Sequence, residues 1–168
     1  IQQAHGYVSF TQLCHVIQNA LASSQQPNLG LKIGSSEGLI SMGILGFAMQ
    51  YCKTVADALE IALRYHQVSG SVLNLNFTIA GESVELEFIE NITPTNLKIF
   101  LCDELLSSIM ACFNAMLGDH QDIILLELSY TPTTHLAEYQ KIVSCPIHFN
   151  ADRNVIRFKR SMLGLVEN

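Results

Sequence analysis

The stretch that organises the chain is residues 29–70, which read LGLKIGSSEGLISMGILGFAMQYCKTVADALEIALRYHQVSG. Five glycines punctuate residues 29–49, and each glycine in a helix interior costs about 1 kcal/mol relative to alanine. We therefore expect short strand or turn pieces there, packed closely where glycine lets two backbones approach. The later part of the stretch predicts an amphipathic helix that is capped by Thr54 and ends near Tyr65 and His66.

The flanking segments carry clear local signals. Ser9 and Gln12 have the spacing of a capping box, which predicts a helix with an apolar face as far as Leu21. Apolar and polar residues alternate on both sides of Gly81-Glu82, a pattern typical of a β-hairpin. A long apolar helix is expected over 95–117, closed by Gly118. After it we expect strands over 123–130, 145–149 and 155–159, with a short helix over 133–143 between the first two.

This order of elements predicts one α+β domain spanning residues 1–168. We expect an antiparallel sheet of about five or more strands packed with three to four helices. The segment Ser161–Asn168 is interpreted as the start of a linker, and the chain, which opens on Ile1, as a fragment truncated at its N-terminus.

Composition excludes several classes of function. The formal net charge is −6 and only 14% of residues are charged, whereas nucleic-acid and anionic membrane surfaces require a basic face. The five cysteines are odd in number and widely spaced, which argues against a disulfide framework and indicates a reducing, cytoplasmic location. The longest apolar run carries Asp103 and Glu104, so no membrane span is predicted.

Catalytic and metal-binding motifs are missing from the sequence. It contains no nucleophile elbow, H-E-x-x-H, Walker loop or paired-cysteine motif. The six histidines are scattered, and no two have the spacing of metal ligands. We therefore expect no catalytic residue, no metal and no cofactor, and interpret the chain as a non-enzyme.

The order of short motifs resembles the N-terminal effector-binding domain of one branch of the AraC-type transcriptional regulators, the arabinose-binding-like branch. The resemblance covers most of the chain, and each motif gains its specificity from this shared order. The matching pieces are residues 29–34, Gly38-Leu39, residues 45–48, Thr54, Ala58-Leu59, Arg64-Tyr65, Glu138-Tyr139, Cys145-Pro146, Phe149, Asn154, Phe158 and Leu163.

The resemblance implies a domain that senses a small-molecule effector and forms a homodimer. In the family a helix-turn-helix domain binds DNA, and it would follow Asn168. We expect the effector pocket between the sheet and the second and third predicted helices, 54–66 and 95–117. Its candidate lining residues are Phe47, Met49, Tyr65, His66, Phe77, Phe88 and Tyr139. The candidate dimer residues lie on the long helix and are Leu106, Met110 and Phe113.

Two alternatives stay open at this point. A stand-alone enzyme or ligand carrier with an apolar pocket would lack a DNA-binding continuation. A purely structural dimerisation module would have a filled core and no effector. The sequence does not name the effector, the promoter or the direction of regulation.

Overall fold

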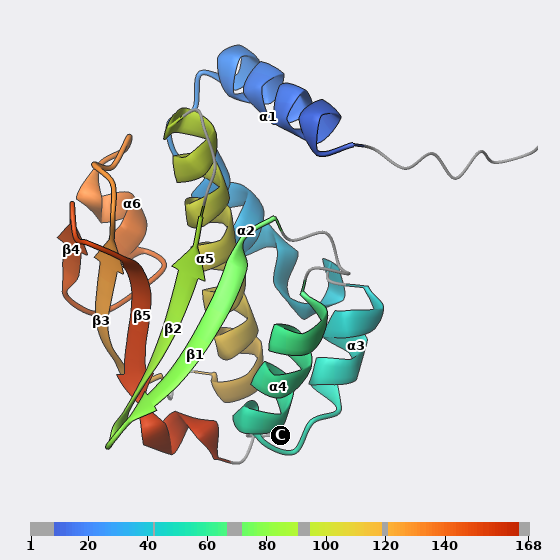
Figure 1. Cartoon of the computed structure of the whole chain (residues 1–168), viewed down its shortest axis with the longest axis vertical. Helices are drawn as coiled ribbons and strands as arrows, with labels where there is room; N and C mark the ends of the chain where they lie inside the picture. Colours follow the sequence, from blue (N-terminus) through green and yellow to red (C-terminus); the bar gives the residue numbers. More distant parts are fainter. Residues whose placement is uncertain (1–8, 42, 67–71, 91–94, 119–120, 165–168) are drawn as a thin grey trace, which may run out of the picture.

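A five-stranded sheet with helices gathered on one face forms the molecule (Figure 1). The computed structural model describes residues 9–41, 43–66, 72–90, 95–118 and 121–164. In chain order the elements are α1 (Phe10–Ser24), α2 (Leu29–Ser41), α3 (Ile44–Gln50), α4 (Val55–Tyr65), β1 (Asn74–Ala80), β2 (Ser83–Ile89), α5 (Thr95–Leu117), β3 (Ile123–Leu128), α6 (Leu136–Gln140), β4 (Ile147–Phe149), β5 (Asn154–Lys159) and the 3₁₀ helix η1 (Arg160–Leu163).

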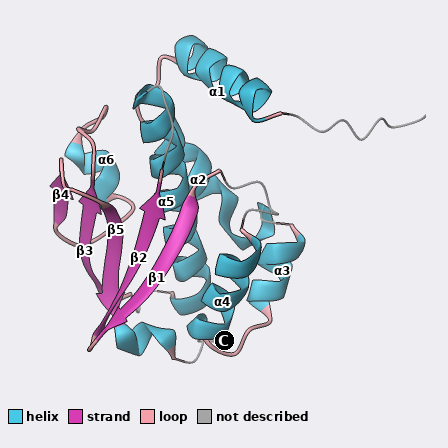
Figure 2. Ribbon diagram, in the orientation of Figure 1, coloured by secondary structure: helices cyan, strands magenta, loops and turns pink. Residues whose placement is uncertain are grey.

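The strands lie in the order β1-β2-β5-β3-β4 (Figure 2). The predicted hairpin is confirmed, with Phe77 opposite Leu86 in the antiparallel β1–β2 pair. The strands β2, β5 and β3 are also antiparallel neighbours, but β3 and β4 are parallel. The connection from Leu128 to Ile147 contains α6 and is long enough for the return that a parallel pair needs. The α+β class is therefore confirmed, with a mixed sheet in place of the wholly antiparallel one expected.

The long helix α5 is the centre of the core. Its bounds match the prediction, and Gly118 closes it with a φ of +55°. Most of its side chains are buried, including the polar Asp103 and Ser107. Within the described residues α5 is also the one helix long and apolar enough to cross a membrane. Its most apolar stretch is 61% buried, as in the core helix of a folded domain.

The prediction for residues 29–49 was wrong, because this segment forms the helices α2 and α3. Gly30 and Gly34 lie one helical turn apart and face α5 across a very close contact. A Cβ at Gly30 would lie 2.5 Å from the carbonyl oxygen of Phe100, and one at Gly34 would overlap the carbonyl oxygen of Glu104. The glycines thus mark close packing, as expected, but between two helices. This segment also brings the number of α-helices above the three to four predicted.

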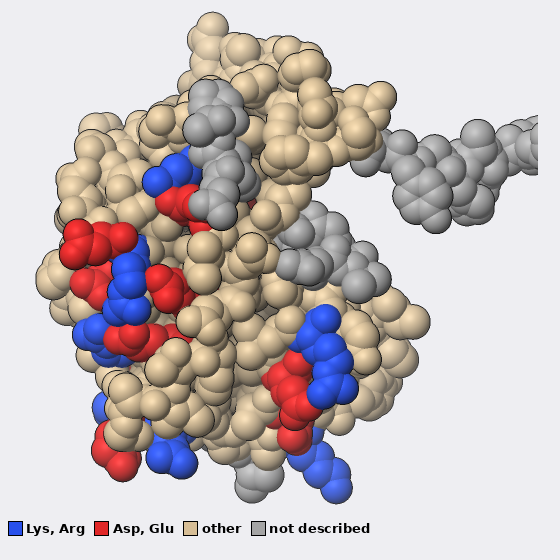
Figure 3. Space-filling view, in the orientation of Figure 1, with Lys and Arg blue, Asp and Glu red and all other residues tan. Residues whose placement is uncertain are grey.

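The two faces of the sheet differ in character. On β2, Val84, Leu86 and Phe88 are buried against the helices, while Glu85 and Glu87 point to the other side. There the two glutamates meet arginines of the β5 region and form the cluster of red and blue atoms over the sheet in Figure 3. Because of this alternation, the face of the sheet that packs against the helices is the one that can line a buried site.

The end of the described chain is not the free linker that was expected from Ser161 onward. The helix η1 buries Met162, and the carbonyl oxygen of Gly164 accepts a hydrogen bond of 3.0 Å from the backbone nitrogen of Val55. The chain is thereby fixed to the first turn of α4 (Figure 1). The rest of the expected linker, 165–168, lies outside the described residues.

Candidate ligand-binding site

A cavity of about 410 Å³ lies between the sheet and the helices α4 and α5. This volume is in the range of small-molecule sites in proteins. Its position between the sheet and these two helices is the one expected from the sequence. The sheet closes one side of the cavity. Leu75 on β1 and Leu86 on β2 line it, together with Leu73, which directly precedes β1. The cavity therefore lies in the apolar layer between the sheet and the helices.

Helix α4 supplies one wall because its apolar residues recur at helical spacing. The hydroxyl of Thr54 accepts a 3.0 Å hydrogen bond from the Asp57 nitrogen and fixes the start of the helix. From there Ala58, Leu59 and Ala62 face the cavity, while Glu60 and Arg64 pair in solvent at 2.7 Å. The cap and the amphipathic pattern together orient this wall.

Helix α5 supplies the opposite wall with residues one turn apart along a single face. Glu104, Ser108 and Cys112 succeed one another at intervals of four, and apolar neighbours fill the spaces between them. Burial raises the pKa of the Cys112 thiol to about 11, so this cysteine is a neutral thiol at physiological pH. It acts as a small apolar group in the wall and is not poised as a nucleophile.

Helix α1 lies over one end of the cavity. The predicted capping box is present, because Gln12 N donates to Ser9 Oγ at 3.2 Å and Ser9 N donates to Gln12 Oε1 at 2.8 Å. Leu13 and Ile17 reach the cavity from this helix, yet no residue of α1 is fully buried. The helix is therefore the most lightly packed part of the cavity wall.

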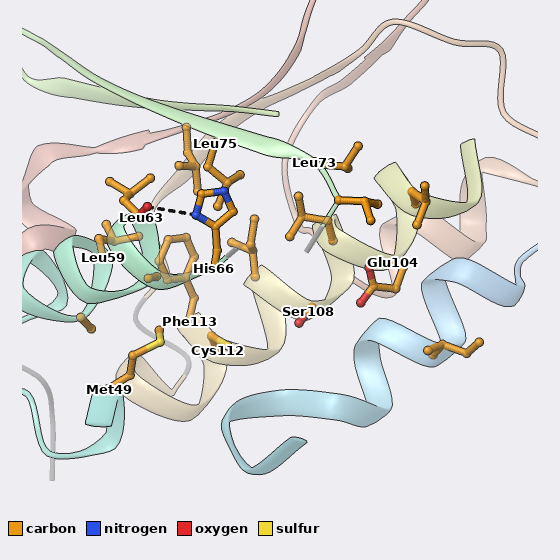
Figure 4. A pocket seen from close by; sticks show the side chains of 18 of the residues that line it. Met49, Leu59, Leu63, His66, Leu73, Leu75, Glu104, Ser108, Cys112 and Phe113 are labelled. Carbon is orange, nitrogen blue, oxygen red and sulfur yellow. Dashed lines mark hydrogen bonds between the residues drawn. The ribbon is translucent and has the colours of Figure 1, made fainter. Parts of the chain in front are cut away.

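The few polar groups of the cavity lie on α4 and α5 (Figure 4). The Nδ1 of His66 lies 3.0 Å from the carbonyl oxygen of Leu63. A carbonyl oxygen only accepts, so Nδ1 donates this hydrogen bond. Glu104 and Ser108 place further polar atoms on the α5 wall. An apolar body with a small number of oriented polar groups is the usual composition of a small-molecule site.

The structure brings only part of the predicted lining set together. Met49 and His66 line the cavity. Phe47 and Tyr65 are 60% and 47% exposed and are not among the lining residues.

The other three predicted lining residues belong to the packed interior or its edge. Phe88 and Tyr139 are fully buried in the core, and Phe77 is half-buried on β1 beside it. None of the three reaches the cavity.

Tyr139 contacts a buried carboxylate instead of the cavity. Its hydroxyl donates to Asp103 at 2.9 Å from Oδ1, and the Tyr130 hydroxyl donates to the same oxygen at 2.6 Å. Burial raises the Asp103 pKa to about 6, although both hydroxyl hydrogen bonds lower it. This cluster connects α5 to α6 and to the end of β3, and it explains why a carboxylate is tolerated in the core.

The three candidate dimer residues are buried within one chain. Leu106, Met110 and Phe113 are 0%, 5% and 2% exposed, and the ring of Phe113 packs edge-on against Phe158 at 5.3 Å between centroids. A side chain enclosed by its own fold has no surface to offer a second copy. The long apolar helix is therefore explained by its central position in the core.

Sequence reasoning missed most of the lining. Leu13 and Ile17 belong to the apolar face recognised on the first helix, and that face was the available signal. Glu104 is one of the few charged residues of the predicted helix over 95–117, and that was the available signal for it. Among the described residues no group of three or more His, Cys, Asp and Glu side chains is arranged to hold a metal ion.

The fold is an α+β domain, and it contains a cavity of small-molecule size. The chain belongs to the family described as "Arabinose-binding domain of AraC transcription regulator, N-term", whose model matches residues 1–165. The family expected from the sequence motifs is thus confirmed. An ornithine utilization regulator of Pseudomonas aeruginosa is 24% identical over 151 residues, which are 89% of this chain and 44% of that protein.

A solved structure shows the same fold. The crystal structure of the transcriptional regulator CdpR from Pseudomonas aeruginosa matches with a TM-score of 0.75 and 16% identity, over 95% of this chain and 52% of that one. The chain therefore spans about half the length of these two relatives, both of which are named as regulators.

Proposed function

We propose that this domain senses a small-molecule effector and passes the signal to a helix-turn-helix domain that follows Asn168, as part of a cytoplasmic AraC-type regulator. The observation that carries the proposal is the cavity of about 410 Å³ in a domain of this family. A purely structural dimerisation module would have filled this space, because protein interiors are packed at close to crystal density.

The walls indicate what kind of effector fits. Apolar side chains from five helices and two strands favour an apolar body. His66, Glu104 and Ser108 favour at least one hydrogen-bonding group on the same molecule. An entirely polar ligand such as a free sugar would leave many hydroxyls without partners against these walls, at a cost of about 1–3 kcal/mol each.

A route from the cavity to the following chain starts at Val55. Its side chain lines the cavity, and its backbone nitrogen holds the carbonyl oxygen of Gly164 at 3.0 Å. An effector that favours one position of α4 therefore favours one position of the chain as it leaves the domain. By linkage, the bound state would then shift the affinity or spacing of the attached DNA-binding domains.

We also propose that the protein forms a homodimer, but not through the residues of α5 that were expected from the sequence. Leu106, Met110 and Phe113 are enclosed in one chain, so a dimer must form through other residues. Sedimentation velocity of the full-length protein, with and without effector, measures the oligomeric state directly.

A thermal-shift screen tests the sensing function. The compounds are chosen with apolar bodies and one polar group, and fully polar sugars and amino acids serve as the contrasting set. Binding to the native state raises the midpoint, because a ligand at about 100 times its Kd stabilises by about 2.7 kcal/mol. A saturable rise with one chemical class supports the proposal, and no rise with any class supports the dimerisation-only alternative.

A further inference from the structure

Helix α3 has two apolar faces, although only one of them meets the core. Leu45 and Met49 are each 5% exposed and pack inward. On the other face Ile44, Phe47 and Tyr51 are 89%, 60% and 72% exposed. We call these three residues the α3 patch. The rings of Phe47 and Tyr51 lie 4.9 Å apart, and Ile44 precedes Phe47 by three residues, which places the two on neighbouring turns of one helix face.

The patch lies on an uncharged helix. No residue of α3 is charged, and Lys53 is the first charged residue after it in the chain. Three side chains of this size at these exposures present roughly 400–500 Å² of largely apolar surface. A contiguous apolar area of that size on a folded domain is characteristic of a binding surface.

The area indicates what kind of partner covers it. A stable complex between free proteins buries about 800 Å² on each partner, so this patch alone is about half of what an independent dimer needs. A partner joined by the same chain needs less contact, because a short tether raises its effective concentration to the order of millimolar. The patch therefore suits an intramolecular partner better than a second copy.

The described part of the chain ends near the Tyr51 end of the patch. Gly164 is bound to Val55, and Tyr51 is only four residues before Val55 in the chain. Four residues span at most about 14 Å when fully extended. The family model describes an N-terminal domain, and the two relatives are about twice as long as this chain. Because the family is that of an N-terminal domain, the additional length of such a protein would follow the end of this domain.

We propose that the α3 patch is the docking surface for the domain that follows Asn168 in the full-length chain. Met49 faces the effector cavity from the same helix whose outer face carries Phe47, so a shift of α3 on effector binding would change the docking surface directly. This inference rests on the proposed function in one respect, because it requires that a DNA-binding domain follows.

Hydroxyl-radical footprinting of the full-length protein tests the docking. Phe47 and Phe10 are the same residue type and are 60% and 53% exposed in this domain, so Phe10 on α1 is an internal reference. If the patch is covered, Phe47 is oxidised roughly fivefold more slowly than Phe10, because packed interface cores resemble protein interiors. Equal oxidation rates mean an uncovered patch and overturn the proposal.

A matched pair of variants identifies what covers the patch. Ile44→Asp places a charge on the patch at the first residue of α3, where an aspartate is compatible with the helix end. Leu136→Asp makes the same change at the first residue of α6, where the leucine is 47% exposed. Docking of the following domain predicts that only Ile44→Asp restores rapid oxidation of Phe47, with the sedimenting mass unchanged. A fall in mass with Ile44→Asp identifies a second copy as the occupant and overturns the proposal.

Binding of the full chain to random-sequence duplex DNA at low salt is measured in parallel. Non-specific binding depends on the DNA-binding domain and its phosphate contacts. DNA binding without protection of Phe47 shows that the docking inference is wrong while the DNA-binding half of the proposed function holds. Absence of DNA binding shows that the proposed function itself has failed.

Discussion

The hydroxyl of Tyr139 on α6 donates a 2.9 Å hydrogen bond to the carboxylate of Asp103 on α5, in a site where Asp103 is 1% exposed. Tyr130 donates to the same carboxylate from the end of β3. Three elements of the fold therefore meet at one buried acidic group. The cost of burying that charge is reduced only by these two hydroxyls and by protonation.

Tyr139→Phe should destabilise the domain by about 2 kcal/mol at pH 7, because a buried hydrogen bond to a charged group is lost. It should also raise the pKa of Asp103 further, since the hydroxyl is one of the groups that lower it. Urea unfolding measures the first effect. Tyr51→Phe is the control, because the Tyr51 side chain is 72% exposed, and its stability should change by less than about 0.5 kcal/mol.

Asp103 should make the domain more stable at pH 5 than at pH 7. Its pKa of about 6 in the fold lies above the unfolded value of about 3.9, so the folded state takes up a proton between these two values. Stability therefore rises as the pH falls through this window, by about 1 kcal/mol between pH 7 and pH 5. Asp103→Asn removes the titrating group, and an unchanged pH profile in that variant would contradict the assignment.

Gly34→Ala should separate α2 from α5 and cost about 3 kcal/mol. The new methyl group would overlap the Glu104 carbonyl oxygen and Ser107 Oγ, and it would lie 2.9 Å from the Ser108 nitrogen. Chemical denaturation of the variant measures the loss. Ser35→Ala on the exposed side of the same helix is the matched control, and equal stability of the two variants would refute the close α2–α5 contact.

Arg157→Met should cost about 1 kcal/mol at pH 7. The guanidinium of Arg157 donates to Glu85 Oε1 at 2.6 Å on the outer face of the sheet, and this hydrogen bond is the main cause of the lowered Glu85 pKa. Because that pKa is lowered, the stabilisation is present above about pH 4.5 and is lost as the pH falls. Arg64→Met in the exposed pair with Glu60 should change stability much less, and equal effects would contradict this account.

The elements that the sequence predicted correctly depend on interactions within a few residues. The Ser9 capping box, the Thr54 cap and the hairpin around Gly81 all formed as expected. The helix α5 also kept its predicted bounds. Each of these signals is local, so the identity of distant partners does not affect it.

The glycine-rich stretch shows where local reasoning fails. The helix propensity of glycine argues against α2, but Gly30 and Gly34 allow α5 to approach so closely that packing outweighs that penalty. The parallel pairing of β3 with β4 depends on where α6 returns the chain, and no pattern within either strand specifies that.

The cavity lies where the sequence predicted a pocket, but Met49 and His66 are the two predicted lining residues that line it. Its place between the sheet and the two helices followed from the order of amphipathic elements. The individual residues depend on helix rotation, which separates the exposed Phe47 from the cavity-lining Met49 two positions later. Tyr139 is an aromatic residue that was expected to line the pocket, but its hydroxyl donates to Asp103, a partner 36 residues away.

The central claim, that the cavity binds the effector, is tested most directly with two phenylalanine variants of α4. Ala62 is half-buried and lines the cavity, whereas Ala56 is exposed on the same helix. Ala62→Phe places an aromatic ring at the cavity wall, and Ala56→Phe places the same ring in solvent.

Isothermal titration of the strongest compound from the thermal-shift screen is made into the wild type and both variants. We predict that Ala56→Phe binds with unchanged affinity and that Ala62→Phe binds at least roughly tenfold more weakly, a loss of about 1.4 kcal/mol. Circular dichroism confirms that both variants are folded. If folded Ala62→Phe binds the compound as tightly as the wild type, the effector site is not this cavity.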